Sequence, residues 1–239
     1  MIVDVDIGNT NAKWRCVGSD QVYSQPTSSL LNAWAYGGGE VARVRVASVA
    51  GAEVLQSIVS DIKARWGVEA EVACVRRVCA GLTVCYEDVS RLGVDRWLSM
   101  LSAYRVVGSD CVVVSAGSAM TADWVAGNGQ HLGGFIAPGR ERMLASLYND
   151  MANVLRSPRS PSDNPSTSLG RSTEGCVDGG VAILLQGFIN HVASRHFGAP
   201  IILAGGDAHA MLSVCAQEHK SQVSLVSNPV LDGLAIALP

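Results

Sequence analysis

Four short stretches of this chain combine residue types and spacings that phosphate chemistry uses. The first is DIGNTNAK at positions 6–13, in which Asp6 and Lys13 flank a glycine turn. A glycine lets backbone N–H groups approach an anion, Asn9 and Thr10 add side-chain donors, and Lys13 could reach a terminal phosphate. Asp6 is the acidic group that could hold a magnesium ion at a nucleotide. The same letters also fit an ordinary hairpin, since Gly-Asn is common in tight turns.

Two further glycine turns follow apolar strands. AGSAMTAD at positions 116–123 offers the hydroxyls of Ser118 and Thr121 together with Asp123, and LAGGDA at 203–208 ends in a Gly-Gly turn. Each could be a plain loop. Taken with the first turn, they would suit an adenosine that lies across the ends of the strands.

The fourth stretch, LGVDRW, places Asp95 and Arg96 at the start of an expected helix. An aspartate there is favoured by the helix dipole alone. In a catalytic interpretation, Asp95 would be a general base that takes a proton from a substrate hydroxyl. Arg96 would then bind a substrate carboxylate.

The hydrophobic pattern predicts an alternation of strands and helices that must position these residues. Period-2 alternation and β-branched residues predict strands, 3.6-residue spacing with glycine stops predicts helices, and serine with proline predicts a loop. The expected strands are 1–5, 11–17, 21–25, 43–49, 69–75, 110–127 (two strands and a turn), 131–139, 200–208 and 223–228; the expected helices are 52–67, 95–107, 140–155 and 173–196; the expected loop is 157–169.

The two halves of the chain resemble each other. When Gly8 is placed on Gly117, DIGNT overlies SAGSA, so that Ser115 takes the place of Asp6, and the order of strands and helices is similar. We therefore expect two similar α/β lobes, an N-terminal lobe over 1–108 and a C-terminal lobe over 109–239, that face a central cleft.

Composition excludes several classes of protein. The chain has 239 residues, 48% hydrophobic and 16% charged, as in folded soluble proteins. A formal net charge of −3 gives no bulk attraction to nucleic acid or to an anionic membrane. The seven cysteines form no Cys-x-x-Cys pair, which favours free thiols in a reducing compartment. We identify no signal peptide and no apolar run that spans a bilayer, and we expect a cytoplasmic protein without nucleic-acid or membrane partners.

Taken together, these motifs resemble those of the type III pantothenate kinase family, within the acetate and sugar kinase, Hsp70 and actin superfamily. The resemblance rests on DIGNTNAK at 6–13, GVDR at 93–96, AGSAMTAD at 116–123 and GGFIAPG at 133–139, with GRSTEG at 170–175 and LDGL near the C-terminus. It extends over the whole chain in the same order. It implies an α/β fold of two ribonuclease H-like lobes, the actin-like ATPase fold.

The resemblance implies ATP-dependent phosphorylation of pantothenate to 4'-phosphopantothenate, the first step of coenzyme A biosynthesis. It implies ATP and magnesium as cofactors, usually with a monovalent cation such as potassium or ammonium, and a homodimer. The residues that the resemblance assigns are Asp95 as the base; Asp6, Ile7, Gly8, Asn9, Thr10, Asn11, Ala12, Lys13 and Ser118 for ATP, with Asp6 at magnesium; and Tyr86, Gly93, Val94, Asp95, Arg96 and Thr173 for pantothenate.

The chain departs from the family pattern at three serines. Ser172 precedes Thr173 where the family usually has Asn-Thr. Ser118 stands where threonine is usual and keeps the hydroxyl, whereas Ser115 stands where aspartate is usual and removes a negative charge. We therefore expect the monovalent-cation site to be weak. Two other functions fit the same fold: a kinase of another small alcohol, and a catalytically weak accessory regulator.

Overall fold

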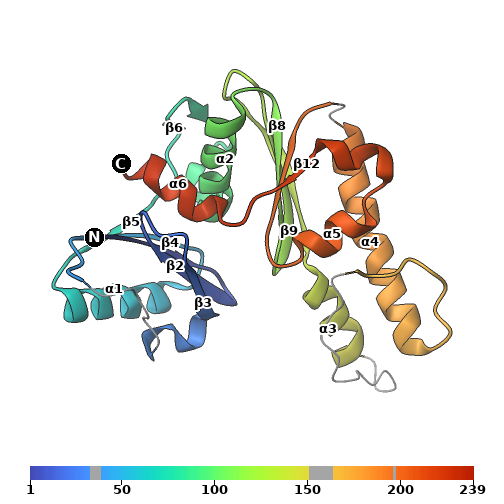
Figure 1. Ribbon diagram of the computed structural model, residues 1–239, viewed down its shortest axis with the longest axis horizontal. Coiled ribbons are helices and arrows are strands. Elements are labelled where there is room, and N and C mark those ends of the chain that lie inside the picture. The colour runs from blue at the N-terminus through green and yellow to red at the C-terminus, as the bar shows by residue number, and fades with distance from the viewer. Residues whose placement is uncertain (33–38, 151–163, 196–197) are drawn as a thin grey trace. The chain divides into compact units, whose positions relative to one another are not determined.

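The computed structural model describes residues 1–32, 39–150, 164–195 and 198–239, which form two compact units (Figure 1). Unit 1 comprises 1–106, 128–131 and 228–239, and unit 2 comprises 107–127 and 132–227. The change of unit near residue 107 is close to the boundary expected at 108. The last twelve residues, expected in the C-terminal lobe, belong to unit 1 instead.

Unit 1 is built on a five-stranded sheet in the order β3-β2-β1-β4-β5. Its elements are β1 (Ile2–Ile7), β2 (Asn11–Cys16), β3 (Val22–Pro26), η1 (Thr27–Asn32), β4 (Arg43–Ser48), α1 (Ala52–Trp66), β5 (Ala70–Val72), β6 (Val78–Cys79), β7 (Leu82–Thr83), η2 (Val89–Arg91), α2 (Val94–Val107) and α6 (Pro229–Ala237). β1, β2 and β3 are antiparallel neighbours, whereas β4 runs parallel to β1 and β5 runs parallel to β4.

Strict alternation along β1 separates its two faces. Val3, Val5 and Ile7 are fully buried in a core that includes Ile58 and Ile62 of α1. Because successive strand residues point to opposite faces, the residues between them point away from α1. The opposite face of β1 therefore carries the acidic side chains of this strand.

An ion-pair network on that second face anchors the C-terminal helix α6, which packs on β1 and β4 (Figure 1). Asp4 is completely buried and accepts a hydrogen bond from Arg45 Nε at 2.7 Å. Arg15 lies 3.6 Å from the other oxygen of Asp4 and also contacts Asp232 of α6 at 2.7 Å. Gly233 allows α6 to approach α2 closely as well, because a Cβ there would lie 2.2 Å from Leu98 O of α2.

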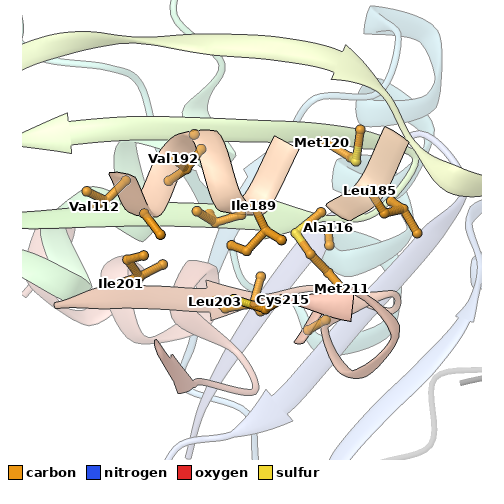
Figure 2. Close-up of a cluster of buried hydrophobic side chains, with 14 of the residues drawn as sticks. Val112, Ala116, Met120, Leu185, Ile189, Val192, Ile201, Leu203, Met211 and Cys215 are labelled. Carbon is orange, nitrogen blue, oxygen red and sulfur yellow. The ribbon is translucent and has the colours of Figure 1, made fainter. Parts of the chain in front are cut away.

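Unit 2 contains a second five-stranded sheet, in the order β10-β9-β8-β11-β12. Its elements are β8 (Cys111–Ala116), β9 (Ala119–Val125), β10 (His131–Pro138, the first residue of which is counted with unit 1), α3 (Arg140–Asp150), α4 (Thr173–Arg195), β11 (Ile201–Ala204), α5 (Ala208–Val214), η3 (Gln217–Gln222) and β12 (Val223–Leu225). Figure 2 shows its core, in which Leu185, Ile189 and Val192 of α4 point toward the strands.

Helix α4 differs from the expectation that the chain has no apolar run long enough to span a bilayer. It has 23 residues and is apolar enough to cross a membrane by length and composition, although no such run was expected. Seven of its residues are nevertheless buried in unit 2. The apolar character therefore reflects, in large part, its place as a core helix.

The two sheets have the same construction, which confirms the predicted internal repeat. In each sheet an antiparallel hairpin is followed by two strands parallel to its first strand, so β1 corresponds to β8 and β4 to β11. Asp6 pairs with Lys13 and with Ala47, and Ser115 pairs with Thr121 and with Ala204. The overlay of Asp6 on Ser115 therefore holds in register as well as in sequence.

Most predicted elements are present, with differences at particular places. α1 ends at Gly67, whose φ of 68° is left-handed, as the glycine stop predicted. The tail that follows Pro229 is a helix, and α5 and the β6–β7 hairpin were not predicted. α3 is described to residue 150, and both the rest of the helix expected there and residues 157–163 of the expected loop lie outside the described residues. The part over 164–169 contains neither helix nor strand.

Candidate active site

The turn between β1 and β2 is closed by its own backbone. Gly8 N–H donates to Asn11 O at 3.0 Å, and a Cβ at Gly8 would lie 2.7 Å from that oxygen. Thr27, the first residue of η1, secures the turn, since its hydroxyl donates to Gly8 O at 2.8 Å and its N–H to Thr10 O at 2.9 Å. Position 8 therefore requires glycine, because Asn11 O approaches it too closely for a Cβ. The Gly8 N–H is already hydrogen-bonded within the turn.

The hairpin residues divide into two groups by side-chain exposure. Asn9, Thr10 and Asn11 are exposed at the tip, where their side chains could meet a phosphate. Ile7 and Ala12 are completely buried in the core of unit 1. If these two residues belong to an ATP site, as the resemblance implied, their backbone alone is available for it.

Asp6 is a carboxyl group whose pKa is changed by its surroundings in unit 1. The pKa of Asp6 is raised from 3.8 to about 7, because burial and, second, the charge of Asp95 raise it by more than the charge of Lys13 lowers it. Two residues that the sequence singled out separately, Asp6 and Asp95, are thus near enough for their charges to interact. A pair of neighbouring carboxylates of this kind favours either a bound proton or a bound cation.

The GVDR segment forms the first turn of α2. Asp95 Oδ1 accepts a hydrogen bond from Arg96 N at 2.8 Å. The same oxygen would lie 2.5 Å from a Cβ at Gly93, so a larger residue there would displace the carboxylate. Glycine at 93 therefore leaves room for the Asp95 side chain, and Val94, the first residue of α2, is buried.

Arg96 is held by an aromatic residue from the preceding segment. Its Nη1 donates to the Tyr86 hydroxyl at 3.1 Å, and its guanidinium lies 5.9 Å from the centre of the Tyr86 ring. His131 is fully buried and stacks on the same ring, with the ring centres 5.9 Å apart. Tyr86 thus fixes one end of a guanidinium that could bind a carboxylate.

Sequence reasoning missed two residues that support this arrangement. Arg77 donates to the carbonyls of Val84, Tyr86 and Glu87, and so holds the segment that carries Tyr86. His131 comes from a distant part of the chain and lies behind Tyr86. Neither residue belongs to a recognisable local pattern, and no signal in the sequence could have found them.

In unit 2, three glycine turns pack against one another at the strand ends. A Cβ at Gly139 would lie 1.9 Å from Gly117 O, and one at Gly205 would lie 2.2 Å from Ala116 O. Gly139 N–H donates to Ser118 O at 3.2 Å, which ties the GGFIAPG segment to the β8–β9 turn. The second and third glycine turns predicted from the sequence therefore do meet, together with a fourth.

The structure brings together only part of the predicted site within one unit. Asp6, Lys13 and Asp95 interact within unit 1. Ser118 is half-buried at its turn in unit 2, and Thr173 is exposed at the start of α4 in the same unit. A single site that includes residues of both units stays a prediction.

The carboxylates of unit 1 fit the magnesium ion that the resemblance implies. Among the described residues, no cluster of three or more histidine, cysteine or acidic side chains could form a complete metal site. Magnesium, however, commonly takes only one or two protein carboxylates, with nucleotide phosphates and water as its other ligands. Asp6, with Asp95 beside it, satisfies that requirement.

Comparisons with known proteins agree on one family. The family model for type III pantothenate kinase matches residues 2–195. A type III pantothenate kinase of Ectopseudomonas mendocina is 34% identical over 252 residues, covering 100% of this chain and 99% of that protein. Another, of Chromohalobacter salexigens, is 35% identical over 88% of this chain and 79% of that protein.

Solved structures with low identity share the fold. A putative Baf family transcriptional activator from Campylobacter jejuni has a TM-score of 0.61 at 19% identity, and covers 98% of this chain and 95% of its own. A putative 2-dehydro-3-deoxygalactonokinase from Sinorhizobium meliloti has a TM-score of 0.57 at 14% identity, with 99% and 98% coverage. The predicted fold class, an α/β protein of two lobes of the actin-like ATPase and sugar kinase type, is confirmed.

Proposed function

Because this chain belongs to the type III pantothenate kinase family, we propose that the carboxylates of unit 1 carry out its reaction. The activity itself, ATP-dependent phosphorylation of pantothenate in coenzyme A biosynthesis, follows from the family. The observation that supports the assignment of residues is the proximity of Asp6 at the end of β1 to Asp95 at the start of α2.

Asp95 is the general base. Phosphoryl transfer needs the attacking hydroxyl to be oriented and relieved of its proton. Asp95 takes the proton from the pantothenate hydroxyl, the hydroxyl oxygen bonds to the γ-phosphorus of ATP, and ADP leaves. The hydrogen bond from Arg96 N keeps Oδ1, and with it the carboxylate, oriented.

Asp6 and Lys13 serve the phosphates of ATP. When magnesium is bound, it neutralises charge on the phosphates, and Asp6 holds it directly or through water. Lys13, paired with Asp6 across the hairpin, contributes a positive charge on the same face. The exposed tip residues Asn9, Thr10 and Asn11 supply further donors, and Ser118 contributes a hydroxyl from unit 2.

Arg96 binds the pantothenate carboxylate. A guanidinium pairs with a carboxylate through two parallel hydrogen bonds, and the hydroxyl of Tyr86 holds Nη1 in place. Gly93 leaves room for the Asp95 carboxylate, and Thr173 at the start of α4 adds a substrate contact. Ser115 offers an oxygen without a charge, so the monovalent cation that the family usually employs binds weakly.

We further expect a cytoplasmic homodimer. α4 has exposed apolar side chains, Ile183 at 54% and Leu184 at 57% relative exposure, on the part of the helix that does not face its own core. A second copy of the chain that covers them would remove this apolar area from water. Sedimentation of the purified protein tests the dimer directly.

A coupled ADP-release assay with the variant Asp95→Asn tests the proposed base. Turnover should fall by about 10²–10⁴, the usual contribution of a general base, while the affinities for ATP and pantothenate change little. Asp61→Asn is the matched control, since Asp61 lies on α1 of the same unit and pairs with Arg65. Near-normal turnover of Asp95→Asn would assign the base to another residue.

A further inference from the structure

A cysteine and a histidine form a close pair beside the proposed pantothenate site. Cys85 Sγ lies 3.4 Å from His131 Nδ1. Cys85 is exposed, whereas His131 is fully buried and its ring is fixed by stacking on Tyr86. The sulfur is therefore accessible from outside, and the nitrogen beside it is held in place.

The other two exposed thiols have different surroundings. Cys74 Sγ donates to Val72 O at 3.9 Å, and Cys176 Sγ donates to Gly170 O at 3.6 Å. A carbonyl can only accept the thiol proton in a hydrogen bond and cannot remove it. An imidazole nitrogen can remove that proton, and the imidazolium that results stabilises the thiolate.

We propose that Cys85 is a nucleophilic thiol, activated by His131, that reacts with low-molecular-weight disulfides. In the tautomer with its proton on Nε2, His131 accepts the Cys85 proton at Nδ1. The thiolate attacks one sulfur of the disulfide, a new S–S bond forms to Cys85, and the original S–S bond breaks. The leaving thiolate takes up the proton from His131, and a second thiol reverses the reaction.

The modification would block the substrate site, a consequence that rests on the proposed function. Cys85 immediately precedes Tyr86, the hydroxyl of which holds Arg96. A group attached to Cys85 Sγ must occupy space beside His131, on which the Tyr86 ring stacks. Displacement of that ring frees the guanidinium, so pantothenate binding should weaken while ATP binding is unaffected.

The first test measures reactivity without any enzymatic assay. The complete protein is treated with 2-hydroxyethyl disulfide near neutral pH, and each cysteine is quantified by peptide mass spectrometry. Cys85 should be modified about tenfold faster than Cys74, as expected when a neighbouring base raises the thiolate fraction of an ordinary thiol. Equal rates at Cys85, Cys74 and Cys176 would overturn the proposal, whatever the role of Asp95 or Arg96.

Two variants assign the effect. His131→Gln should reduce the rate at Cys85 to that at Cys74, with circular dichroism as the check on folding; a folded variant with an unchanged rate would exclude His131 as the activating group. The second variant, Cys85→Ser, changes an exposed residue, whereas His131 is buried. It should retain turnover within about twofold and resist the disulfide, and inactivation equal to that of the wild type would contradict the proposal.

The last measurement connects the modification to the substrate. Saturating pantothenate should slow the modification of Cys85 several-fold, and ATP alone should not. The modified enzyme should show a raised KM for pantothenate that dithiothreitol restores. Modification of Cys85 without any change in KM would retain the reactive pair and refute its position beside the substrate.

Discussion

Replacement of Asp6 by asparagine should make the stability of the metal-free protein less dependent on pH, and it should make the enzyme nearly inactive. The pKa of Asp6 is about 7 in the folded protein, because of burial first and the charge of Asp95 second, against an ordinary value of 3.8. In the unfolded chain the side chain already loses its proton above pH 3.8, whereas the folded protein retains it until about pH 7. Wild-type stability is therefore lost as the pH rises through this window.

The size of the effect follows from that window. Each pH unit within it costs about 1.4 kcal/mol of unfolding free energy. From about pH 5 to about pH 8 the wild type should thus lose roughly 2–3 kcal/mol through Asp6 alone. The asparagine side chain of the variant has no proton to lose, so the difference in unfolding free energy, variant minus wild type, should increase by that amount.

Urea unfolding of both proteins in the presence of a chelator, at the two pH values, measures this difference. Comparison across pH cancels the direct cost of the substitution and the titration of groups unaffected by it. Asp95→Asn is an informative companion, since it should reduce the pH dependence without abolishing it, because burial is the larger cause. A difference that does not change with pH would refute the raised pKa.

In the coupled ADP-release assay, Asp6→Asn should have low turnover at any ATP concentration and a weakened response to magnesium. A magnesium titration identical to that of the wild type would show that Asp6 does not hold the metal.

Three further predictions concern single contacts. Tyr86→Phe removes the hydroxyl that accepts from Arg96 Nη1 at 3.1 Å, and should raise the KM for pantothenate by on the order of tenfold with little change in kcat; a lower kcat at unchanged KM would contradict a role in substrate binding. Ser115→Asp should create or strengthen a response to potassium, whereas the wild type should depend on magnesium and little on potassium or ammonium; a wild type that is inactive without potassium would show that other oxygens build the site. Gly233→Ala should lower the unfolding free energy by about 1–3 kcal/mol through overpacking, since its Cβ would lie 2.2 Å from the backbone oxygen of Leu98, and an unchanged urea midpoint would mean that α6 can shift away.

The local elements of this fold could be predicted because their signals are local. Alternation along β1 and β8, apolar spacing along α1, and glycines at 67 and 108, both with positive φ, each act within a few residues of the structure that they determine. The repeat of DIGNT and SAGSA reflects the same property, since two equal local patterns give two equal hairpins. The motif residues of the candidate site were found by the same means.

Only the tertiary structure decided which of these residues meet. No periodicity places Asp95 beside Asp6, returns α6 to the sheet of unit 1, or brings His131 to Cys85 and Tyr86. These contacts join segments that are far apart in the sequence, and they depend on how whole elements pack. The sequence by itself determined the chemical groups, their elements and the family; packing determined their neighbours, and therefore the raised pKa of Asp6, because burial and nearby charge are properties of the folded surroundings and not of the residue.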